Sequence, residues 1–316
     1  MGRRRRPEGP VHDRVLIVDK PAGPTSHDVV AAIRRRVGHQ RVGHTGTLDP
    51  PATGVLVVCL GRATKLVRFL QAGTKTYAAR IELGLTTDTQ DAAGVELTRT
   101  DAGHLDEATV CAALGAFQGE IEQIPPMVSA VKVDGQRLHE LARRGETVER
   151  DARRVEVSSL VLESFVPGEV AVVSVLLTCS AGTYVRTIAH DLGAALGVGG
   201  RLHTLRRLAN GPFGVEEAVT LPALEEADAA TVRSLGMDPV AAVRRTLEVV
   251  EVTDPDLVRR LTQGGVAPAT GTDRPVALLL PATGERPERL LAIVRDTADG
   301  TCAKSELVWT RPEELT

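Results

Sequence analysis

Alternating hydrophobic and polar positions predict a mixed α+β fold. Residues 14–20 (RVLIVDK) and 55–61 (VLVVCLG) are short apolar runs typical of buried strands. Residues 75–84 (KTYAARIELG) instead alternate with the period of two that a half-buried strand requires. Two further strand-like runs, 155–165 and 170–180, are joined by the turn sequence VPGE, which predicts a β-hairpin.

Segments with a helical repeat of apolar residues lie between these strands. The clearest is 25–38 (TSHDVVAAIRRRVG), which begins with Thr and Ser as possible caps and closes on Gly38. Its apolar side consists of Val29, Val30, Ile33 and Val37. Other helical patterns occupy 63–70, 105–117, 183–196 and 221–235. Because hairpins outnumber strand–helix–strand units, we expect a mixed, largely antiparallel central sheet with flanking helices.

The pattern changes near residue 248, which suggests a domain boundary. Short strand candidates separated by turns containing Pro or Gly lie at 274–280, 289–295 and 305–310. We therefore expect a large domain over residues 14–247 and a small, mostly β domain over residues 248–316. Residues 1–13 are charged and lack periodicity, so they are expected to form a disordered basic tail.

Charge is distributed unevenly along the 316 residues. Residues 216–316 carry 11 Lys and Arg against 18 Asp and Glu, a balance of −7, so the overall charge of −3 leaves +4 for residues 1–215. Runs of Arg in the basic part lie at 3–6, 34–36, 143–144, 153–154 and 206–207. Such runs can follow the phosphates of a nucleic acid, or they can simply be solvated faces.

Several classes of protein and site are disfavoured. The longest apolar runs, VLVVCL and VAVVSVLL, are too short to cross a bilayer, so no membrane association is expected. The widely spaced Cys59, Cys111, Cys179 and Cys302 fit a reducing cytoplasm better than a disulfide framework. The sequence has no P-loop and no metal-ligand spacing among its histidines, so neither cofactor nor metal is expected. Ser26, His27 and Asp28 are consecutive and cannot form a catalytic triad by themselves.

The loop GHTGTLDPPATGVL, residues 43–56, holds a single carboxylate, Asp49, between Leu48 and two prolines. Together with this loop, several segments resemble, in order, the motifs of the TruB family, the tRNA pseudouridine-55 synthases. They are DKPAGPTSHDVV (19–30), RVGHTGTLDPPATGVLVVCLGRATKL (41–66), KTYAARIELGLTTDTQDAAG (75–94), GEIEQIPPMVSAVKVDGQRLHELARRG (119–145), CSAGTYVRTIAHDLG (179–193) and LRRLANGPF (205–213). The resemblance implies the pseudouridine synthase catalytic fold.

The resemblance also implies a catalytic group. Pseudouridine formation breaks the N1–C1′ glycosidic bond, turns the uracil and joins C1′ to C5, and a carboxylate suits chemistry at C1′. By resemblance, Asp49 is this carboxylate and Arg186 is the buried cation that keeps it ionised. Tyr77 would stack on the target uracil and could help to remove the C5 proton. Whether Asp49 attacks the sugar, adds to the base or removes a sugar proton is left open.

Five further residues are implied to contact or support the RNA substrate, each with a simpler alternative. Tyr184 would line the pocket or be an ordinary half-buried tyrosine, and Leu205 would close the pocket from the apolar side unless it is ordinary core. His44 would fill the space that a flipped base leaves, or be a solvated loop residue. Asp91 would support the active-site network or cap a turn. Lys20, in the KPxG motif, would shape the floor of the site or end a surface strand.

The family further implies an RNA-gripping insertion over residues 119–146 and a PUA-like C-terminal domain. The partner would be the T-arm of tRNA, bound by a monomer without an obligatory protein partner. Three alternatives remain: a tRNA-folding chaperone, an RNA-guided synthase that needs protein partners, and a sugar-processing hydrolase. The last would need a second catalytic carboxylate, for which the sequence offers no convincing candidate.

Overall fold

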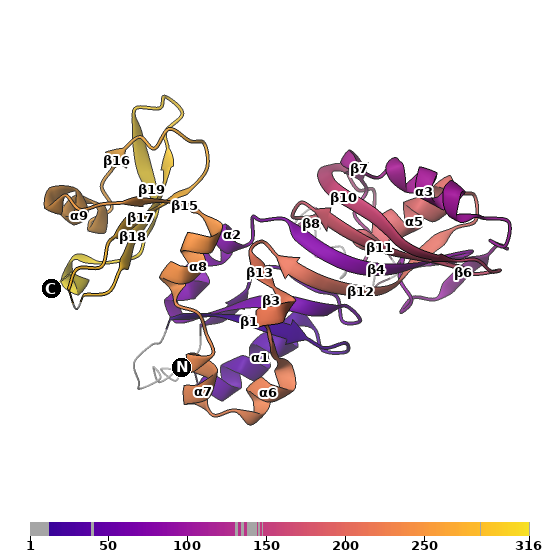
Figure 1. Ribbon diagram of the computed structural model, residues 1–316, viewed down its shortest axis with the longest axis horizontal. Helices are drawn as coiled ribbons and strands as arrows, with labels where there is room; N and C mark the ends of the chain where they lie inside the picture. Colours follow the sequence, from indigo (N-terminus) through magenta and orange to yellow (C-terminus); the bar gives the residue numbers. More distant parts are fainter. Residues whose placement is uncertain are drawn as a thin grey trace.

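The computed structural model describes residues 13–38, 41–129, 148–284 and 286–315, together with 132–133, 136–137, 144 and 146. The predicted tail thus lies outside the described residues except for Asp13, and so does much of the predicted 119–146 insertion. Within the described part, the chain forms an elongated molecule with a long central sheet and a smaller sheet at one end (Figure 1). None of its described helices is long and apolar enough to span a membrane.

The central sheet is mixed and largely antiparallel, as predicted. Within the described residues its strands run in the order β14-β1-β3-β12-β4-β11-β10-β7, with β2 paired to β3 and β13 to β12. Only the β1–β14 and β3–β12 pairs of this sheet are parallel. The strands are β1 (Arg14–Lys20), β2 (Val42–His44), β3 (Thr53–Leu60), β4 (Lys75–Leu83), β7 (Gly119–Gln123), β10 (Arg153–Val166), β11 (Ala171–Cys179), β12 (Gly200–Asn210), β13 (Phe213–Gly214) and β14 (Val219–Thr220).

Local sequence signals set several elements. Helix α1 (Ser26–Val37) begins after Thr25, whose side chain and that of Asp28 form a reciprocal capping box, and it ends at Gly38 in the left-handed conformation. The predicted helix over residues 221–235 is instead two short helices, α6 (Leu221–Glu226) and α7 (Ala229–Ser234). The break occurs because Ala227 is extended and Asp228 caps a new helix.

Further helices and two small hairpins belong to the same part of the chain as the central sheet. The helices are η1 (Gly61–Leu66), α2 (Val67–Leu70), α3 (Glu107–Gly115), α5 (Val185–Ala195), η2 (Val215–Glu217) and α8 (Pro239–Thr246). The hairpins pair β5 (Leu85–Thr87) with β6 (Glu96–Arg99) and β8 (Lys132–Val133) with β9 (Gln136–Arg137). Helices α3 and α5 pack on the β4–β11–β10 half of the sheet, whereas α1, α6 and α7 pack near β1 and β3 (Figure 1).

The C-terminal unit is β-rich, as predicted. Its strands β15 (Glu248–Glu251), β16 (Ala267–Pro268), β17 (Val276–Leu280), β18 (Arg289–Asp296) and β19 (Cys302–Val308) form a sheet in the order β15-β17-β18-β19-β16. Helix α9 (Pro255–Thr262) packs against β18 and β19, and η3 (Pro312–Glu314) ends the unit. β15 begins at residue 248, although the domain limits themselves remain a prediction.

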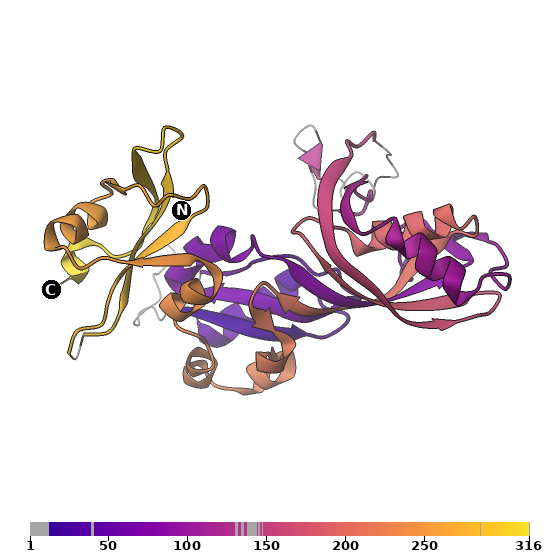
Figure 2. The ribbon, with the colours of Figure 1, turned by 45° about the horizontal axis from the view of Figure 1, so that its top comes forward.

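One hydrophobic core crosses from the central sheet to the C-terminal unit. It brings Val15 and Phe69 together with Leu279, Ile293 and Trp309. At its edge, the guanidinium of Arg62 lies 5.2 Å from the centre of the Trp309 ring and 2.6 Å from a carboxylate oxygen of Glu314. Figure 2 shows the C-terminal sheet seated on the end of the molecule that carries α2 and α8.

Candidate active site

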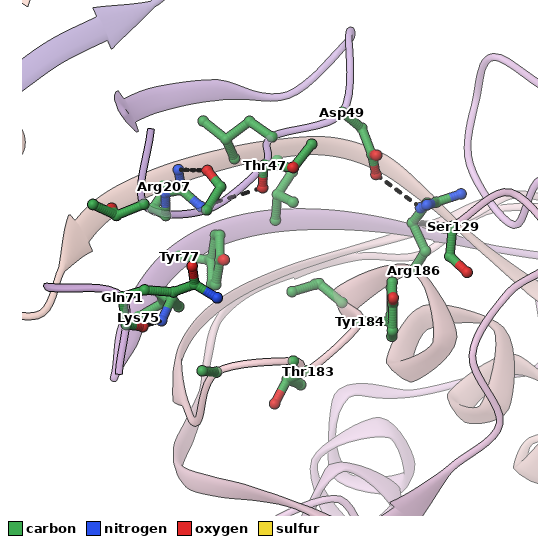
Figure 3. A pocket seen from close by; sticks show the side chains of 17 residues that line it. Thr47, Asp49, Gln71, Lys75, Tyr77, Ser129, Thr183, Tyr184, Arg186 and Arg207 are labelled. Carbon is green, nitrogen blue, oxygen red and sulfur yellow. Dashed lines mark hydrogen bonds and ion pairs between the residues drawn. The ribbon is translucent and has the colours of Figure 1, made fainter. Parts of the chain in front are cut away.

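A cavity of about 270 Å³ opens beside the junction of β4 and β12. It is enclosed by the loop 45–49, by the two strands themselves, and by residues 181–186 at the start of α5, with Gln71 and Ser129 completing the lining. Figure 3 shows Asp49 and Arg186 together at one end, Tyr77 in the middle, and Lys75 with Gln71 at the other end. The cavity therefore joins parts of the chain that are far apart in the sequence.

Ser26 anchors the loop that carries Asp49 through two hydrogen bonds. The Ser26 hydroxyl accepts a hydrogen bond from the Leu48 amide at 2.8 Å and donates one to the Leu48 carbonyl at 3.1 Å, and Ser26 is fully buried. Ser26 stands at the first position of α1, so the capped start of this helix fixes its place. The residue next to the catalytic candidate is thereby bound on both of its backbone polar groups.

Lys20 holds the other side of the same loop. Its ammonium donates to the carbonyls of Pro21 at 2.9 Å, Pro50 at 3.1 Å and Ala52 at 2.7 Å, and the residue is 0% exposed. The alternative of a surface strand end is therefore wrong. Burial lowers the pKa of Lys20 to about 8, although the nearby Asp49 carboxylate opposes this change. Lys20 lies under the loop and does not line the cavity.

Arg207 is the third residue that supports the loop. The sequence suggests that the 206–207 pair follows phosphates or is a solvated face, and neither interpretation fits Arg207. Its guanidinium donates to the carbonyls of Gly46, Thr47 and Val55 at 3.1, 3.4 and 2.7 Å. The residue is 1% exposed, so it is neither a solvated residue nor one free to follow phosphates. Its backbone also requires Gly54, because a Cβ there would lie 2.1 Å from the Arg207 carbonyl oxygen.

We expect Ser26→Ala to slow turnover and to lower the free energy of unfolding by about 1–3 kcal/mol, because it strands two buried backbone groups of Leu48. The substitution leaves Asp49 in place but frees its loop. The loss should therefore fall on kcat more than on KM, measured by steady-state kinetics beside urea unfolding. The matched control is Ser158→Ala. Ser158 lies on an exposed part of β10, and its hydroxyl donates to the carbonyl of Thr178. An unchanged kcat in Ser26→Ala would contradict the positioning role.

Asp49 and Arg186 form the ion pair at one end of the cavity. The Arg186 Nε lies 3.1 Å from Asp49 Oδ2, and its Nη1 lies 3.6 Å from Asp91 Oδ2. The same guanidinium donates to the carbonyls of Thr89 at 3.0 Å and Val128 at 2.8 Å. The Arg186 side chain is 4% exposed, whereas that of Asp49 is 41% exposed, so the carboxylate faces the cavity.

Asp91 makes contacts in two directions, to a turn and to Arg186. Its Oδ1 accepts hydrogen bonds from the Thr89 hydroxyl at 2.6 Å and the Ala93 amide at 3.1 Å, which is a turn cap. Its Oδ2 is the atom that faces Arg186. The turn therefore holds the second carboxylate of the network in a fixed direction.

The electrostatic balance at Asp49 has identifiable causes. Loss of solvation raises its pKa above the ordinary value, and the Asp91 charge raises it further. Arg186 is the strongest opposing influence and lowers the pKa, with help from Lys20. Without its cations, Asp49 would tend to bind a proton and lose its charge.

Aromatic and apolar side chains form the walls. Tyr77, on β4, is buried, and burial raises the pKa of its hydroxyl. Tyr184 caps the start of α5 without a side-chain bond, and its backbone exchanges two hydrogen bonds with the Gln123 amide, at 3.0 and 3.2 Å. Leu205, on β12, also lines the cavity and packs against the core behind it. These three residues come together as the sequence interpretation expects.

Comparison with known proteins decides the family. The model of the TruB family pseudouridylate synthase N-terminal domain matches residues 34–185, and that of the tRNA pseudouridylate synthase B C-terminal domain matches residues 186–251. A tRNA pseudouridine synthase B from Symbiobacterium thermophilum is 50% identical over 81% of this chain and 83% of its own. One from Thermobifida fusca is 50% identical over 85% and 91%. The chain belongs to the TruB family.

Solved structures support the same fold for this TruB family member. A chain in the crystal structure of a Cbf5-Nop10-Gar1 complex superposes with a TM-score of 0.72 at 28% identity, covering 95% of this chain and 86% of that one. A chain in an H/ACA RNP bound to a substrate RNA containing 2′-deoxyuridine gives 0.69 at 25% identity, covering 96% and 88%. The predicted family and fold class are thereby confirmed.

His44 stands apart from the cavity in this TruB chain. It ends β2, where its Nδ1 accepts a hydrogen bond from the Gly46 amide at 3.2 Å and its ring meets His27 edge-on at 5.4 Å. Burial, followed by the charges of His27 and Arg207, lowers the pKa of His44 to about 4. The ring is therefore neutral near pH 7. Because His44 does not line the cavity, its predicted RNA contact stays a prediction.

The sequence interpretation missed three residues at this site. Sequence patterns mark Ser26 only as a helix cap, and Arg207 only as part of a basic pair. Lys75 stands in the quoted KTY segment but was given no role. Its proximity to Tyr77 on the same strand face was the available signal, since residues two apart on a strand point to the same side.

Proposed function

We propose that this chain isomerises uridine 55, in the T-arm of tRNA, to pseudouridine, with Asp49 as the catalytic carboxylate. Membership of the TruB family makes the chain a pseudouridine synthase, an isomerase that acts on uridine in tRNA. The observation that carries the residue assignment is the Asp49–Arg186 pair, 3.1 Å apart, at one end of a cavity with aromatic walls.

The cavity favours isomerisation over hydrolysis. Glycosidases generally need two carboxylates flanking the bond that breaks. Among the described residues that line this cavity, Asp49 is the only carboxylate. Asp91 is turned to Arg186 and to its own turn, and it is nearly buried. One carboxylate can stabilise or trap positive charge at C1′. The atom that then bonds to C1′ is C5 of the detached base, so no second carboxylate is needed to activate a water.

The size of the cavity suits one nucleoside. Small-molecule pockets typically occupy about 300–1,000 Å³, and this one, at about 270 Å³, is near the lower end. A uridine within a folded RNA arm must therefore leave its stack to enter, as in other enzymes that act on bases. Tyr77 would stack on the uracil, and Leu205 and Tyr184 would enclose it. His44, neutral and outside the cavity, would fill the space that the base leaves in the RNA.

We infer that the protein acts as a monomer in the cytoplasm without an obligatory protein partner. The relatives that match over most of their length are named tRNA pseudouridine synthase B. The Cbf5 neighbour, by contrast, is seen in a complex with Nop10 and Gar1. The higher identity to the first group favours the unaided enzyme over an RNA-guided one.

The test uses the purified protein alone and an unmodified tRNA transcript carrying tritium at uridine C5. Because C5 exchanges its hydrogen for a bond to C1′, each turnover should release one tritium to water. We expect stoichiometric release of one tritium per tRNA, and none from a transcript in which uridine 55 is replaced by cytidine. Tight tRNA binding without release would favour the chaperone or the partner-dependent synthase. Release that persists in the cytidine transcript would contradict the assignment to position 55.

A further inference from the structure

Lys75 is a buried cation at the end of the cavity opposite Asp49 (Figure 3). It is 6% exposed and begins β4, two residues before Tyr77. Its ammonium donates to the carbonyls of Gln71 at 2.8 Å and Gly73 at 2.7 Å. An ammonium has three hydrogens to donate. In the described part of the chain, the third hydrogen of Lys75 has no protein acceptor.

The charge of Lys75 is also uncompensated. Among the described residues, neither Lys75 nor Lys20 has a carboxylate within 4.0 Å of its Nζ, but the charge of Asp49 acts on the pKa of Lys20, whereas no carboxylate is among the main influences on that of Lys75. Burial, together with the like charge of Arg207, lowers the pKa of Lys75 to about 8, and Cys179 opposes this change. A buried charge without a partner is costly, so a site that keeps one beside its substrate cavity favours a negative group there.

The reaction creates such a group transiently. When the C1′–N1 bond breaks, its electron pair stays on N1, and the detached uracil is an anion whose charge spreads to its two carbonyl oxygens. C5 then bonds to C1′, a proton leaves C5, and N1 gains a proton, so the net change is an isomerisation without any redox partner. The bound uridine is neutral, so a fixed cation near the base stabilises the anion far more than the substrate.

The strand geometry places Lys75 where the far edge of the base would lie. Residues two apart on a strand point to the same face and are separated by about 7 Å. A uracil ring, its carbonyl and the hydrogen bond that this carbonyl accepts together span a comparable distance. A uracil stacked on Tyr77 with its ribose at Asp49 would therefore direct a carbonyl oxygen towards the Lys75 end of the cavity (Figure 3).

We propose that Lys75 is a catalytic residue that donates a hydrogen bond to a carbonyl oxygen of the departing uracil and stabilises its negative charge. This inference rests on the proposed function. The two ends of the cavity then have different roles. Asp49 stabilises the positive charge that develops on the sugar, and Lys75 stabilises the negative charge that develops on the base.

The test compares Lys75→Met and Lys75→Arg on two RNAs, one with uridine and one with 5-fluorouridine at the target position. Fluorine stabilises the uracil anion, so the departing base needs less help from the protein. The readout is the single-turnover loss of the starting nucleoside after nuclease digestion, because 5-fluorouridine has no C5 proton to release. We expect Lys75→Met to slow loss of uridine by about 10²–10³-fold, as for other donors to a developing anion. The slowing should be clearly smaller for 5-fluorouridine, and Lys75→Arg should retain most of the rate on both.

Lys20→Met is the matched control, since Lys20 is a buried lysine that also donates to backbone carbonyls but does not line the cavity. It should slow both RNAs by the same factor. An equal factor on both RNAs for Lys75→Met would overturn the proposal and leave Lys75 a structural residue. If Lys75→Met does not fold, Lys75→Gln carries the same comparison. A wild-type protein inactive on uridine would instead indicate failure of the proposed function.

Discussion

Asp49→Asn is expected to abolish turnover while leaving the affinity for tRNA largely unchanged. The substitution keeps the size of the side chain and a carbonyl oxygen for Arg186, so the cavity and its rim should persist. It removes the negative charge, and with it the ability to stabilise or trap the cation that develops at C1′. Loss of a group that acts directly on the reacting atom costs about 10⁴-fold or more in rate.

The measurement is tritium release under single-turnover conditions, with tRNA binding followed separately by filter retention. Asp106→Asn is a suitable control, because Asp106 does not line the cavity, it caps α3 through the Thr109 amide, and Asn is an equally good cap. We expect this control to match the wild type. An Asp49→Asn protein that still releases tritium at more than about a hundredth of the wild-type rate would exclude Asp49 as the catalytic carboxylate.

Arg186→Ala is expected to damage both activity and stability. The guanidinium is the cation that Asp49 and Asp91 share, and it also binds the carbonyls of Thr89 and Val128. Removing one partner of a buried ion pair costs about 3–5 kcal/mol. The lower end applies, since Asp49 is partly exposed to solvent that screens its charge. Urea unfolding should therefore show a loss of about 3 kcal/mol at pH 7.

The same variant should change the pH dependence in a defined direction. Arg186 lowers the pKa of Asp49, so its removal raises that pKa further above the ordinary value. Any residual activity that needs the carboxylate should then fall at a higher pH on the acid side than in the wild type. The folded variant also binds this proton more tightly than the unfolded chain does. Its stability should therefore rise as the pH falls through the raised pKa.

Arg186→Lys provides the comparison, because an ammonium keeps the positive charge but not the planar geometry that reaches several acceptors. We expect it to recover part of the lost stability and to move the acid limb back towards the wild-type position. An Arg186→Ala protein with unchanged unfolding free energy and an unchanged acid limb would show that the ion pair contributes neither to the fold nor to the charge of Asp49.

Elements governed by local signals could be predicted from the sequence. Residues 14–20 form β1, as their apolar run indicates, and α1 starts and stops where its Thr25 cap and Gly38 place it. Likewise, the hairpin of β10 and β11 follows from two strand-like runs around a turn containing Pro and Gly. Asp49, Tyr77 and Arg186 were singled out through family motifs, and the fold brings all three to one cavity.

Features that depend on distant partners could not be predicted. The strand β12 (Gly200–Asn210) contains two adjacent arginines, and its sequence does not alternate cleanly between apolar and polar residues. It is a strand because it lies between β3 and β4, which supply its hydrogen bonds. Similarly, Arg207 reads as a surface residue, yet it is buried because its donors meet carbonyls of a loop up to 161 residues away. The local sequence around a polar side chain does not reveal that its hydrogen-bond acceptors are main-chain atoms of a distant segment.

The core shared by the central sheet and the C-terminal unit governs how these two parts could be separated experimentally. Because Val15 and Phe69 pack with Leu279, Ile293 and Trp309, a protein shortened at residue 247 would expose a wide apolar surface to water. Its weaker RNA binding could then arise from aggregation of the remaining part. The contribution of the acidic C-terminal unit is better measured by reversing charges on its outer surface, which leaves the joint hydrophobic contact intact, and calorimetry of the whole chain should show both parts melting together.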